Sequence, residues 1–346
     1  MFLPRCVATG IGSLPHTQPQ EALAAIRRFL PEAPFWPQLP NRGNHESMGP
    51  QFLPGLPGWV GEERLRVDPA TVTVEERTDF FERAFGQADQ GWPLDINQAA
   101  GYGAFLEAEW LPAPRLFKGQ ITGPITMGIS VTDPEEKPVL YNDEMMELIC
   151  TQLAQLARGQ ESALEKKAGG HNTKTLIFLD EPWMAAYGSA FATFSREQVI
   201  RYLTWVMEGI QGLRAVHCCA NTDWSLLLAT PVDVLSFDAY GYGDKVMLFA
   251  EDLAAFLERG GYLAWGIVPS EAPLAEKESA ATLVCRLESL GKQLAQHLPS
   301  VQFLWERSFI TPACGLGNQS EAAAEKILEM TAQVAAQMQS KVEGGL

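Results

Sequence analysis

Short apolar runs alternate along the chain with longer segments whose apolar residues recur at helical spacing. Between the runs we predict helices over residues 20–29, 74–87, 143–166, 196–209, 246–259, 276–296 and 321–341. Strands that alternate with helices form parallel sheets, and eight strand–helix units make a closed (β/α)8 barrel. We therefore predict one (β/α)8 TIM-barrel domain, of class α/β, over residues 1–346. Its eight strands are predicted at Cys6–Thr9, Phe35–Gln38, Arg115–Ile121, Thr175–Asp180, Arg214–His217, Val234–Phe237, Leu263–Val268 and Gln302–Glu306.

Two segments depart from this pattern. Residues 31–69 are rich in proline and glycine and weak in periodicity, so we predict a long excursion around and after the second strand. Long loops of this kind are commonly functional, and either a surface flap or a lid over a substrate fits the sequence. Residues 336–346 are polar and end in Glu-Gly-Gly-Leu, which predicts a frayed tail.

The charge balance narrows the range of partners. The chain of 346 residues has 26 basic and 42 acidic side chains, a net charge of −16, and no basic run. Phosphate-rich partners are bound mainly by Lys and Arg, so we expect neither nucleic acid nor an anionic membrane as a partner. No stretch approaches the roughly 18 apolar residues of a membrane span, and the start lacks a signal-peptide pattern. We expect a cytoplasmic protein whose six cysteines are reduced.

Candidate metal ligands follow two of the predicted strands. His217 and Cys219 come directly after the fifth apolar run and, being two residues apart, face the same way in an extended chain. Cys314 follows the eighth predicted strand, and the carboxyl ends of barrel strands meet at one mouth. One imidazole and two thiolates suit tetrahedral Zn²⁺ with an exchangeable fourth position. The alternative is that all three are ordinary buried core residues.

Acidic and glycine-rich segments follow three other strands. Asp238, after the sixth strand, fits either a displaceable fourth metal ligand or a helix cap. Asp180-Glu181-Pro182, after the fourth strand, could hold a substrate ammonium group, although acids at strand ends also cap helices. After the first strand, the backbone N–H groups and hydroxyl of Ile11-Gly12-Ser13 could hold a carboxylate, and the spacing there is not that of a dinucleotide fingerprint.

In this order the motifs resemble the catalytic half of cobalamin-independent methionine synthase. They are similar as well to the zinc methyltransferases that use corrinoid proteins, which belong to the superfamily of uroporphyrinogen decarboxylase. The resemblance runs from about residue 5 to residue 335 and implies the same barrel fold. Its motifs are Ile11-Gly12-Ser13, Gly123-Pro124-Ile125-Thr126, Asp180-Glu181-Pro182, His217-x-Cys219, Asp238 and Cys314-Gly315-Leu316.

The resemblance implies ligands and substrate contacts residue by residue. Zn²⁺ would be bound by His217, Cys219 and Cys314, with Asp238 as the exchangeable fourth ligand. The residues implied to hold homocysteine are Ile11, Gly12, Ser13 and Asp180, with Glu46 as a further candidate.

Three departures from the synthases bear on the methyl donor. Asp238 stands where they carry glutamate, and the segment Met127-Gly128-Ile129-Ser130 lacks the tryptophan expected in the folate-dependent enzymes. Complete synthases also have an N-terminal barrel that helps to bind folate. These departures favour a methylated corrinoid such as methylcobalamin, free or on a partner corrinoid protein, over methyltetrahydrofolate.

The sequence therefore predicts a zinc-dependent methyltransferase that converts homocysteine to methionine. A free thiol is mostly protonated at neutral pH, and coordination to zinc removes the proton to give the nucleophilic thiolate. Three alternatives stay open. They are transfer to another thiol such as coenzyme M, a metal-free lyase like uroporphyrinogen decarboxylase that uses Arg5 and Arg42, and a non-catalytic protein that binds a methyl carrier or stores zinc.

Overall fold

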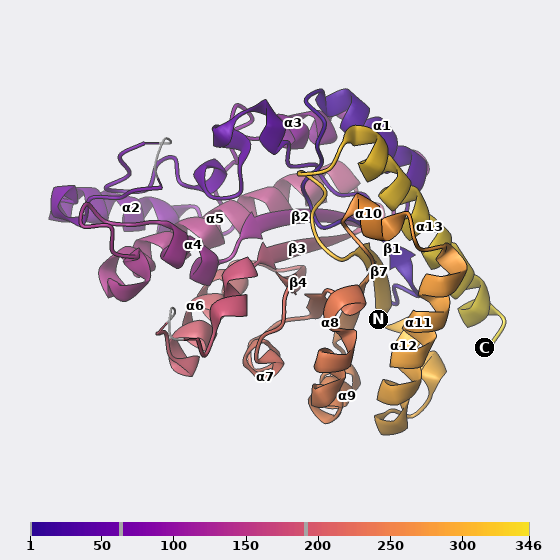
Figure 1. Cartoon of the computed structure of the whole chain (residues 1–346). Helices are drawn as coiled ribbons and strands as arrows, with labels where there is room; N and C mark the ends of the chain where they lie inside the picture. The colour runs from indigo at the N-terminus through magenta and orange to yellow at the C-terminus, as the bar shows by residue number, and fades with distance from the viewer. Residues whose placement is uncertain (1, 62–64, 190–192, 346) are drawn as a thin grey trace.

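Seven parallel strands form one curled sheet with helices around its outside (Figure 1). The structure is a computed structural model that describes residues 2–61, 65–189 and 193–345. Neighbouring strands follow the order β1-β7-β6-β5-β4-β3-β2. The strands are β1 (Val7–Ala8), β2 (Leu116–Thr122), β3 (Lys174–Asp180), β4 (Leu213–Cys218), β5 (Val234–Phe237), β6 (Tyr262–Val268) and β7 (Ser308–Pro312).

An irregular segment occupies the place of the second barrel strand, between β1 and β2. Gln38 pairs in parallel with Ser13 beyond β1, and Phe35 pairs in parallel with Lys118 of β2. Pro34 and Pro37 have no N–H to donate, so this segment forms isolated bridges in place of a continuous ladder. The predicted (β/α)8 architecture is thus confirmed, with an irregular second strand.

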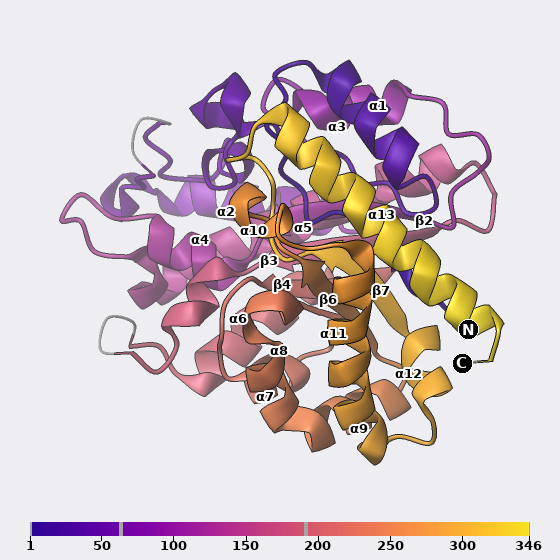
Figure 2. The same cartoon turned by 45° about the vertical axis from the view of Figure 1, so that its right-hand side comes forward.

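Helices cover the outside of the sheet. The two long helices α5 and α13 begin at side-chain caps from Asn142 and Ser320, and α5 ends at Gly169 in the left-handed conformation. In Figure 2, α13 lies alongside α1 and α11, with which it packs. The helices are α1 (Pro19–Phe29), α2 (Val74–Gly86), α3 (Ala100–Glu107), α4 (Pro124–Ser130), α5 (Asp143–Ala168), α6 (Arg196–Glu208), α7 (Trp224–Leu228), α8 (Ala239–Val246), α9 (Ala250–Glu258), α10 (Ala272–Ala275), α11 (Ala280–Leu294), α12 (Val301–Glu306) and α13 (Glu321–Glu343).

Alternate residues of the strands enter two separate apolar layers. One layer fills the barrel interior and includes Leu176, Phe178 and Ala215. The other lies between the sheet and the helices and includes Leu179 and Cys218. Each strand is therefore buried on both faces, as expected for a parallel sheet covered by helices.

The last predicted strand is wrong. Residues 301–306 form helix α12, capped by Ser300, whose side chain accepts a hydrogen bond from the N–H of Phe303. The eighth strand position is taken by β7, which begins at Ser308. A short apolar run does not distinguish a strand from a buried helical turn, and the serine cap decided between them.

Two other predictions differ from the structure in extent. The helix expected over residues 246–259 is divided into the end of α8, a 3-10 turn at Met247–Phe249 and α9. Helix α13 continues to Glu343 through most of the tail predicted to be frayed. Met338 and Val342 are buried there, because the polar residues of this segment lie on the opposite side of an amphipathic helix.

The excursion of residues 31–69 contains short 3-10 turns, and its residues 62–64 lie outside the described part of the chain. The turns are Pro40–Arg42, Asn44–Glu46, Pro50–Phe52 and Pro69–Thr71. Phe52 and Leu53 are buried in the outer apolar layer, which attaches the segment to the barrel.

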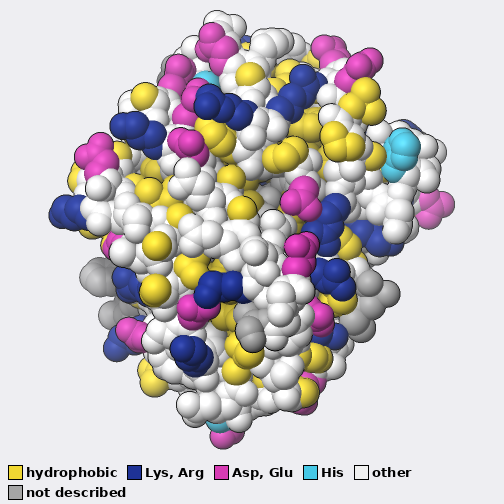
Figure 3. Space-filling view, turned by 90° about the vertical axis from the view of Figure 1, so that its right-hand side faces the viewer, with side chains coloured by type: hydrophobic (Ala, Val, Ile, Leu, Met, Phe, Trp, Pro, Cys, Tyr) yellow, Lys and Arg dark blue, Asp and Glu magenta, His cyan; other side chains and the backbone are white. Residues whose placement is uncertain are grey.

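Acidic and basic side chains are interspersed on the face seen in Figure 3, with hydrophobic side chains scattered between them. No basic patch gathers on that face. Across the described ranges, no helix combines the length and apolar character required to cross a membrane.

Candidate active site

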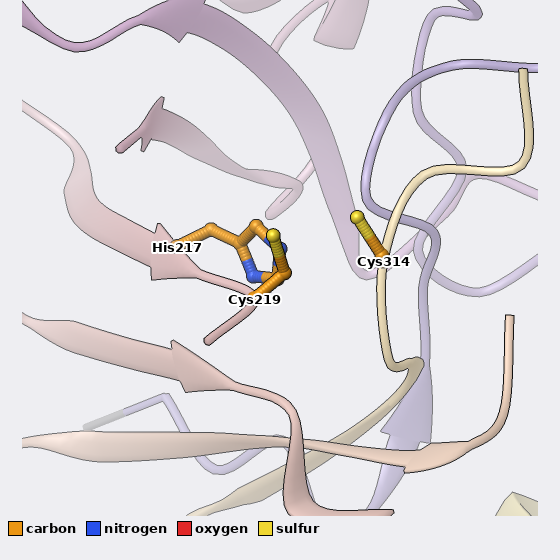
Figure 4. Close-up of side chains that lie close together, drawn as sticks. All are labelled: His217, Cys219 and Cys314. Atoms are coloured by element: carbon orange, nitrogen blue, oxygen red, sulfur yellow. The ribbon is translucent and has the colours of Figure 1, made fainter. Parts of the chain in front are cut away.

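Three potential metal ligands converge at the carboxyl ends of the strands. His217 is the fifth residue of β4, Cys219 follows that strand directly, and Cys314 lies two residues beyond β7. One ligand atom from each lies within 4.8 Å of the other two. Figure 4 shows the side chains of His217 and Cys219 together at one strand end and the sulfur of Cys314 facing them from a separate segment of the chain. The structure thus brings together three of the four side chains predicted as zinc ligands.

The imidazole of His217 is oriented by the neighbouring strand. The register of β4 and β5 places Ser236 beside it, and Ser236 Oγ lies 2.9 Å from His217 Nδ1. His217 Nε2 is buried without a hydrogen-bond partner. When Nδ1 carries the proton and donates to the serine, Nε2 presents its lone pair to a metal.

The thiols of Cys219 and Cys314 share a hydrogen bond. The contact with Cys314, and after it the contact with the imidazole of His217, lowers the pKa of the Cys219 thiol to about 4. The same hydrogen bond to Cys219, together with burial, raises the pKa of Cys314. This set of donors fits zinc: two sulfur atoms that bind a cation as thiolates, and one imidazole nitrogen that no hydrogen bond occupies.

Asp238 is the predicted ligand that the structure places elsewhere. It is the N-cap of α8, and its carboxylate accepts a 2.6 Å hydrogen bond from the N–H of Gly241. Within the described ranges, the group of potential ligands consists of His217, Cys219 and Cys314 without Asp238. Burial raises the pKa of Asp238, and the charge of nearby Cys219 raises it further.

These three side chains line a cavity of about 300 Å³. That volume is at the lower end for small-molecule sites, which suits a small substrate. The cavity also receives residues from the turn after β1, from the end of β3 and from the excursion of residues 31–69. Its lining consists of Ile11, Ser13, Gln38, Pro40, Glu46, Ser47, Met48, Asp180, Pro182, His217, Cys219, Cys314, Gly315, Gly317 and Asn318.

Two buried carboxylates line this cavity, and each has one oxygen atom without a hydrogen-bond partner. They are Asp180, through Oδ1, and Glu46, through Oε2. The other oxygen of Glu46 accepts a 2.5 Å hydrogen bond from Arg42 Nε. A buried carboxylate oxygen without a donor is unfavourable, so both atoms favour a cationic group in the cavity.

The turn after β1 is attached to the loop that holds Cys314. The N–H of Leu316 donates to the carbonyl of Ser13 at 2.9 Å, and the N–H of Gly317 donates to Ser13 Oγ at 3.2 Å. A Cβ atom at Gly315 would lie 2.3 Å from Ser13 Oγ, so glycine is required for this approach. The hydroxyl hydrogen of Ser13 stays available to a ligand.

The remaining predicted substrate residues lie around the same turn. Ile11 lines the cavity, whereas Gly12 packs behind it, where an added Cβ would lie 3.1 Å from the side chain of Gln120. Two polar side chains inside the buried strand β2, Lys118 and Gln120, were not predicted from the sequence. Their alternate positions in an otherwise apolar run could have indicated two polar side chains that face the barrel interior.

Arg5 and Arg42 do not line the cavity. Arg5 precedes β1, at the opposite end of the barrel from the strand ends that hold the site. Arg42 is bound to Glu46 and to the carbonyl of Thr17. All six cysteines lie in the described ranges and are free thiols.

Comparison with known proteins finds similarity in structure. No family model and no curated protein matches the sequence. A B12-independent methionine synthase from a Shewanella species, solved with selenomethionine, is 17% identical with a TM-score of 0.45, and the match covers 66% of this chain but only 63% of that one. A Listeria monocytogenes protein, assigned as a vitamin-B12-independent methionine synthase, is 14% identical with a TM-score of 0.57, and the match covers 93% of this chain and 86% of that one. This chain therefore has the fold of a methionine-synthase-like barrel.

Proposed function

We propose that this protein is a zinc-dependent methyltransferase that transfers a methyl group to the thiol of homocysteine and forms methionine. One observation carries the proposal: the His217, Cys219 and Cys314 cluster opens into the same cavity as two buried carboxylates with unpartnered oxygens. A ligand that carries both a thiol and an ammonium group is complementary to this combination.

The metal would be held by His217 Nε2 and by the sulfur atoms of Cys219 and Cys314. Zinc at that position would keep an incoming thiol as its thiolate, the form that acts as a nucleophile. Asp238 stays a candidate for the fourth position, although its carboxylate caps α8 in this structure. The substrate sulfur would then form its bond to the methyl carbon as the bond between that carbon and the donor breaks.

The cavity favours an amino acid over other thiols. The substrate ammonium group would pair with Asp180 and Glu46, and the carboxylate would accept a hydrogen bond from the hydroxyl of Ser13. Coenzyme M has a sulfonate and no ammonium group, so the two acids would repel it without compensation. This argument supports homocysteine as the acceptor.

The methyl donor stays a prediction from the sequence. The absence of the expected tryptophan after Thr126 favours a methylated corrinoid over methyltetrahydrofolate. The Listeria neighbour is named as B12-independent, which lends no support to a corrinoid donor or to a corrinoid-protein partner. The transfer assay should therefore supply each donor separately.

The lyase alternative is disfavoured, because Arg5 and Arg42 lie away from the cavity. A protein that stores zinc or binds a methyl carrier would bind zinc without methylating a thiol. The two buried acids beside the cluster have no role in zinc storage, which favours the enzyme.

The test is X-ray absorption of the zinc-loaded protein with and without L-homocysteine. We expect one zinc per chain whose first shell gains a sulfur when L-homocysteine is added. An assay of methionine formation with methylcobalamin and with methyltetrahydrofolate then identifies the donor. A zinc shell that does not respond to the thiol, or zinc without methyl transfer from either donor, would refute the proposal.

A further inference from the structure

An ion pair joins two walls of the cavity. Arg42 Nε lies 2.5 Å from Glu46 Oε1, and Arg42 Nη1 donates a 2.7 Å hydrogen bond to the carbonyl of Thr17. Glu46 belongs to the excursion of residues 31–69, whereas Thr17 follows the turn that contains Ser13. The guanidinium group therefore connects the acid proposed for the substrate ammonium group to the segment that carries the hydroxyl proposed for its carboxylate.

The pair forms across a glycine. The 3-10 turns Pro40–Arg42 and Asn44–Glu46 are joined by Gly43, whose φ of 151° is one that other residues rarely adopt. A Cβ atom at Gly43 would also lie 2.7 Å from the ring of His45. The backbone at this glycine thus allows two side chains four positions apart to meet.

The carboxylate of Glu46 is held through one oxygen and open through the other. Its side chain is 0% exposed, and that of Arg42 is 33% exposed. Because Arg42 occupies Oε1, the buried Oε2 atom, which has no partner, is the one left for a ligand. Glu46 lines the cavity and Arg42 does not, so the guanidinium group orients the acid without occupying the substrate space.

Another buried ion pair shows the arrangement that a purely structural role produces. Glu161 of α5 is also completely buried and lies 2.6 Å from Arg158. Its Oε2 atom accepts a further hydrogen bond from the N–H of Gln211 at 2.8 Å, and Oε1 accepts one from Thr175 Oγ1 at 3.2 Å. An apolar pair of similar size would usually stabilise a fold at least as well as a buried ion pair with one oxygen unsatisfied. The open oxygen of Glu46 is therefore explained by a ligand.

We propose that Arg42 is a positioning residue that holds the carboxylate of Glu46 toward the cavity, at a fixed place relative to the turn of Ser13. The site would thereby select thiols that carry an amino group beside a carboxylate. The proposal rests on the proposed function, because it assigns Glu46 to the substrate ammonium group. Arg42 acts through Glu46, and its effect is on the choice of thiol.

The experiment compares two thiols on the zinc-loaded protein by calorimetric titration. L-homocysteine carries the amino group, and 4-mercaptobutyrate is the same molecule without it. Arg42→Met keeps an unbranched side chain but removes every hydrogen bond to Glu46 and Thr17. We expect it to weaken binding of L-homocysteine about tenfold and binding of 4-mercaptobutyrate less than about twofold, with about one zinc per chain retained.

Asn41→Ala is the matched control. Asn41 Nδ2 donates a 2.8 Å hydrogen bond to the carbonyl of Pro15, so it joins the same two segments as Arg42 without contacting Glu46. If Arg42 only attached these segments to each other, both variants would change binding in the same way. We expect Asn41→Ala to leave the ratio of the two dissociation constants within about twofold of that of the wild type.

Equal losses for both thiols in Arg42→Met, or a change of the ratio in Asn41→Ala as large as that in Arg42→Met, would overturn the proposal. If wild-type protein binds neither thiol, or binds both equally, the proposed function itself fails. If wild-type protein prefers L-homocysteine and Arg42→Met keeps that preference, only the role of Arg42 fails.

A double variant keeps the test decisive if Arg42→Met does not fold. Arg42→Met with Glu46→Gln removes both charges together and leaves neither unbalanced. Glu46→Gln alone should weaken binding of L-homocysteine about tenfold, and the double variant should bind it within about twofold of that single variant, because Arg42 acts through Glu46. An unchanged preference in Glu46→Gln, or a further loss of about tenfold in the double variant, would overturn the proposal.

Discussion

At the ends of β3 and β4, neighbouring residues of similar chemistry point to opposite sides of the sheet. At the end of β3, Asp180 faces the cavity with an unpartnered oxygen, while its neighbour Glu181 turns outward. At the end of β4, Cys219 faces the cavity, while its neighbour Cys218 is buried in the outer apolar layer. In each pair, one side chain is available to bind a ligand and the adjacent one packs between the sheet and the helices.

Glu181 shows what a fully satisfied buried acid looks like. Its carboxylate accepts hydrogen bonds from the N–H groups of Ile125 and Thr126, at 2.9 and 2.7 Å, and from the hydroxyl of Thr126 at 2.6 Å. These groups belong to the first turn of α4, so the acid joins β3 to that helix. The Gly123-Pro124 turn permits the contact, because a Cβ at Gly123 would lie 2.3 Å from the Glu181 carboxylate.

The largest expected effect distinguishes the two cysteines. Cys219→Ala should lose zinc altogether, because two protein ligands do not hold the ion in a site of this type. Cys218→Ala, the matched control, should keep about one zinc per chain, since its thiol faces the helices and donates to the carbonyl of Ala220. Zinc content by atomic emission after gel filtration measures both. Equal zinc loss in the two variants would contradict the assignment of faces.

Glu181→Gln should lower the free energy of unfolding by about 3 kcal/mol, because the amide NH2 group cannot accept the hydrogen bonds that one carboxyl oxygen accepts. Urea denaturation followed by circular dichroism measures this change. The folded fraction of the variant should bind L-homocysteine with an affinity within about twofold of the wild type, a change well below a factor of ten. Weakened binding without a loss of stability would place Glu181 in the substrate site, and would contradict the view that Glu181 stabilises the fold whereas Asp180 faces the substrate.

Ser236→Ala should weaken zinc binding about 10-fold to 100-fold, since the serine orients the imidazole that we propose as a zinc ligand. A competition titration against a chromophoric chelator measures the dissociation constant. Ser308→Ala is the control, because that buried hydroxyl bonds the carbonyl of Leu304 in the outer layer. Unchanged zinc affinity in Ser236→Ala would mean that packing alone orients His217.

The smallest expected effect is that of Asp180→Asn on the choice of thiol. The neutral amide cannot form an ion pair with an ammonium group, so L-homocysteine should bind about tenfold more weakly, about 1.4 kcal/mol. Binding of 4-mercaptobutyrate should hardly change, and calorimetry on the zinc-loaded protein compares the two. The same loss for both thiols would indicate that Asp180 supports the metal cluster instead.

Much of the site followed from residue spacing at predicted strand ends. His217 and Cys219 are two residues apart, and parallel strands bring their carboxyl ends to one edge, so convergence with Cys314 was predictable despite the misplaced last strand. The contribution of Ser236 was not predictable, because it depends on the register of β4 against β5. The second acid, Glu46, sits in an irregular segment that carries no periodic signal.

The local pattern of the sequence was enough to predict the class of fold, the positions of most strands and the residue types available at their ends. Those features depend on the alternation of apolar residues and on short motifs, and both can be recognised within a few consecutive residues. Only the tertiary structure shows which acid faces the cavity, that Asp238 caps α8, and that the ammonium group of Lys118 is buried against the carbonyl of Ile11. These outcomes depend on the inward or outward direction of single side chains and on contacts between distant segments, and both are set only when the strands pair and the barrel forms.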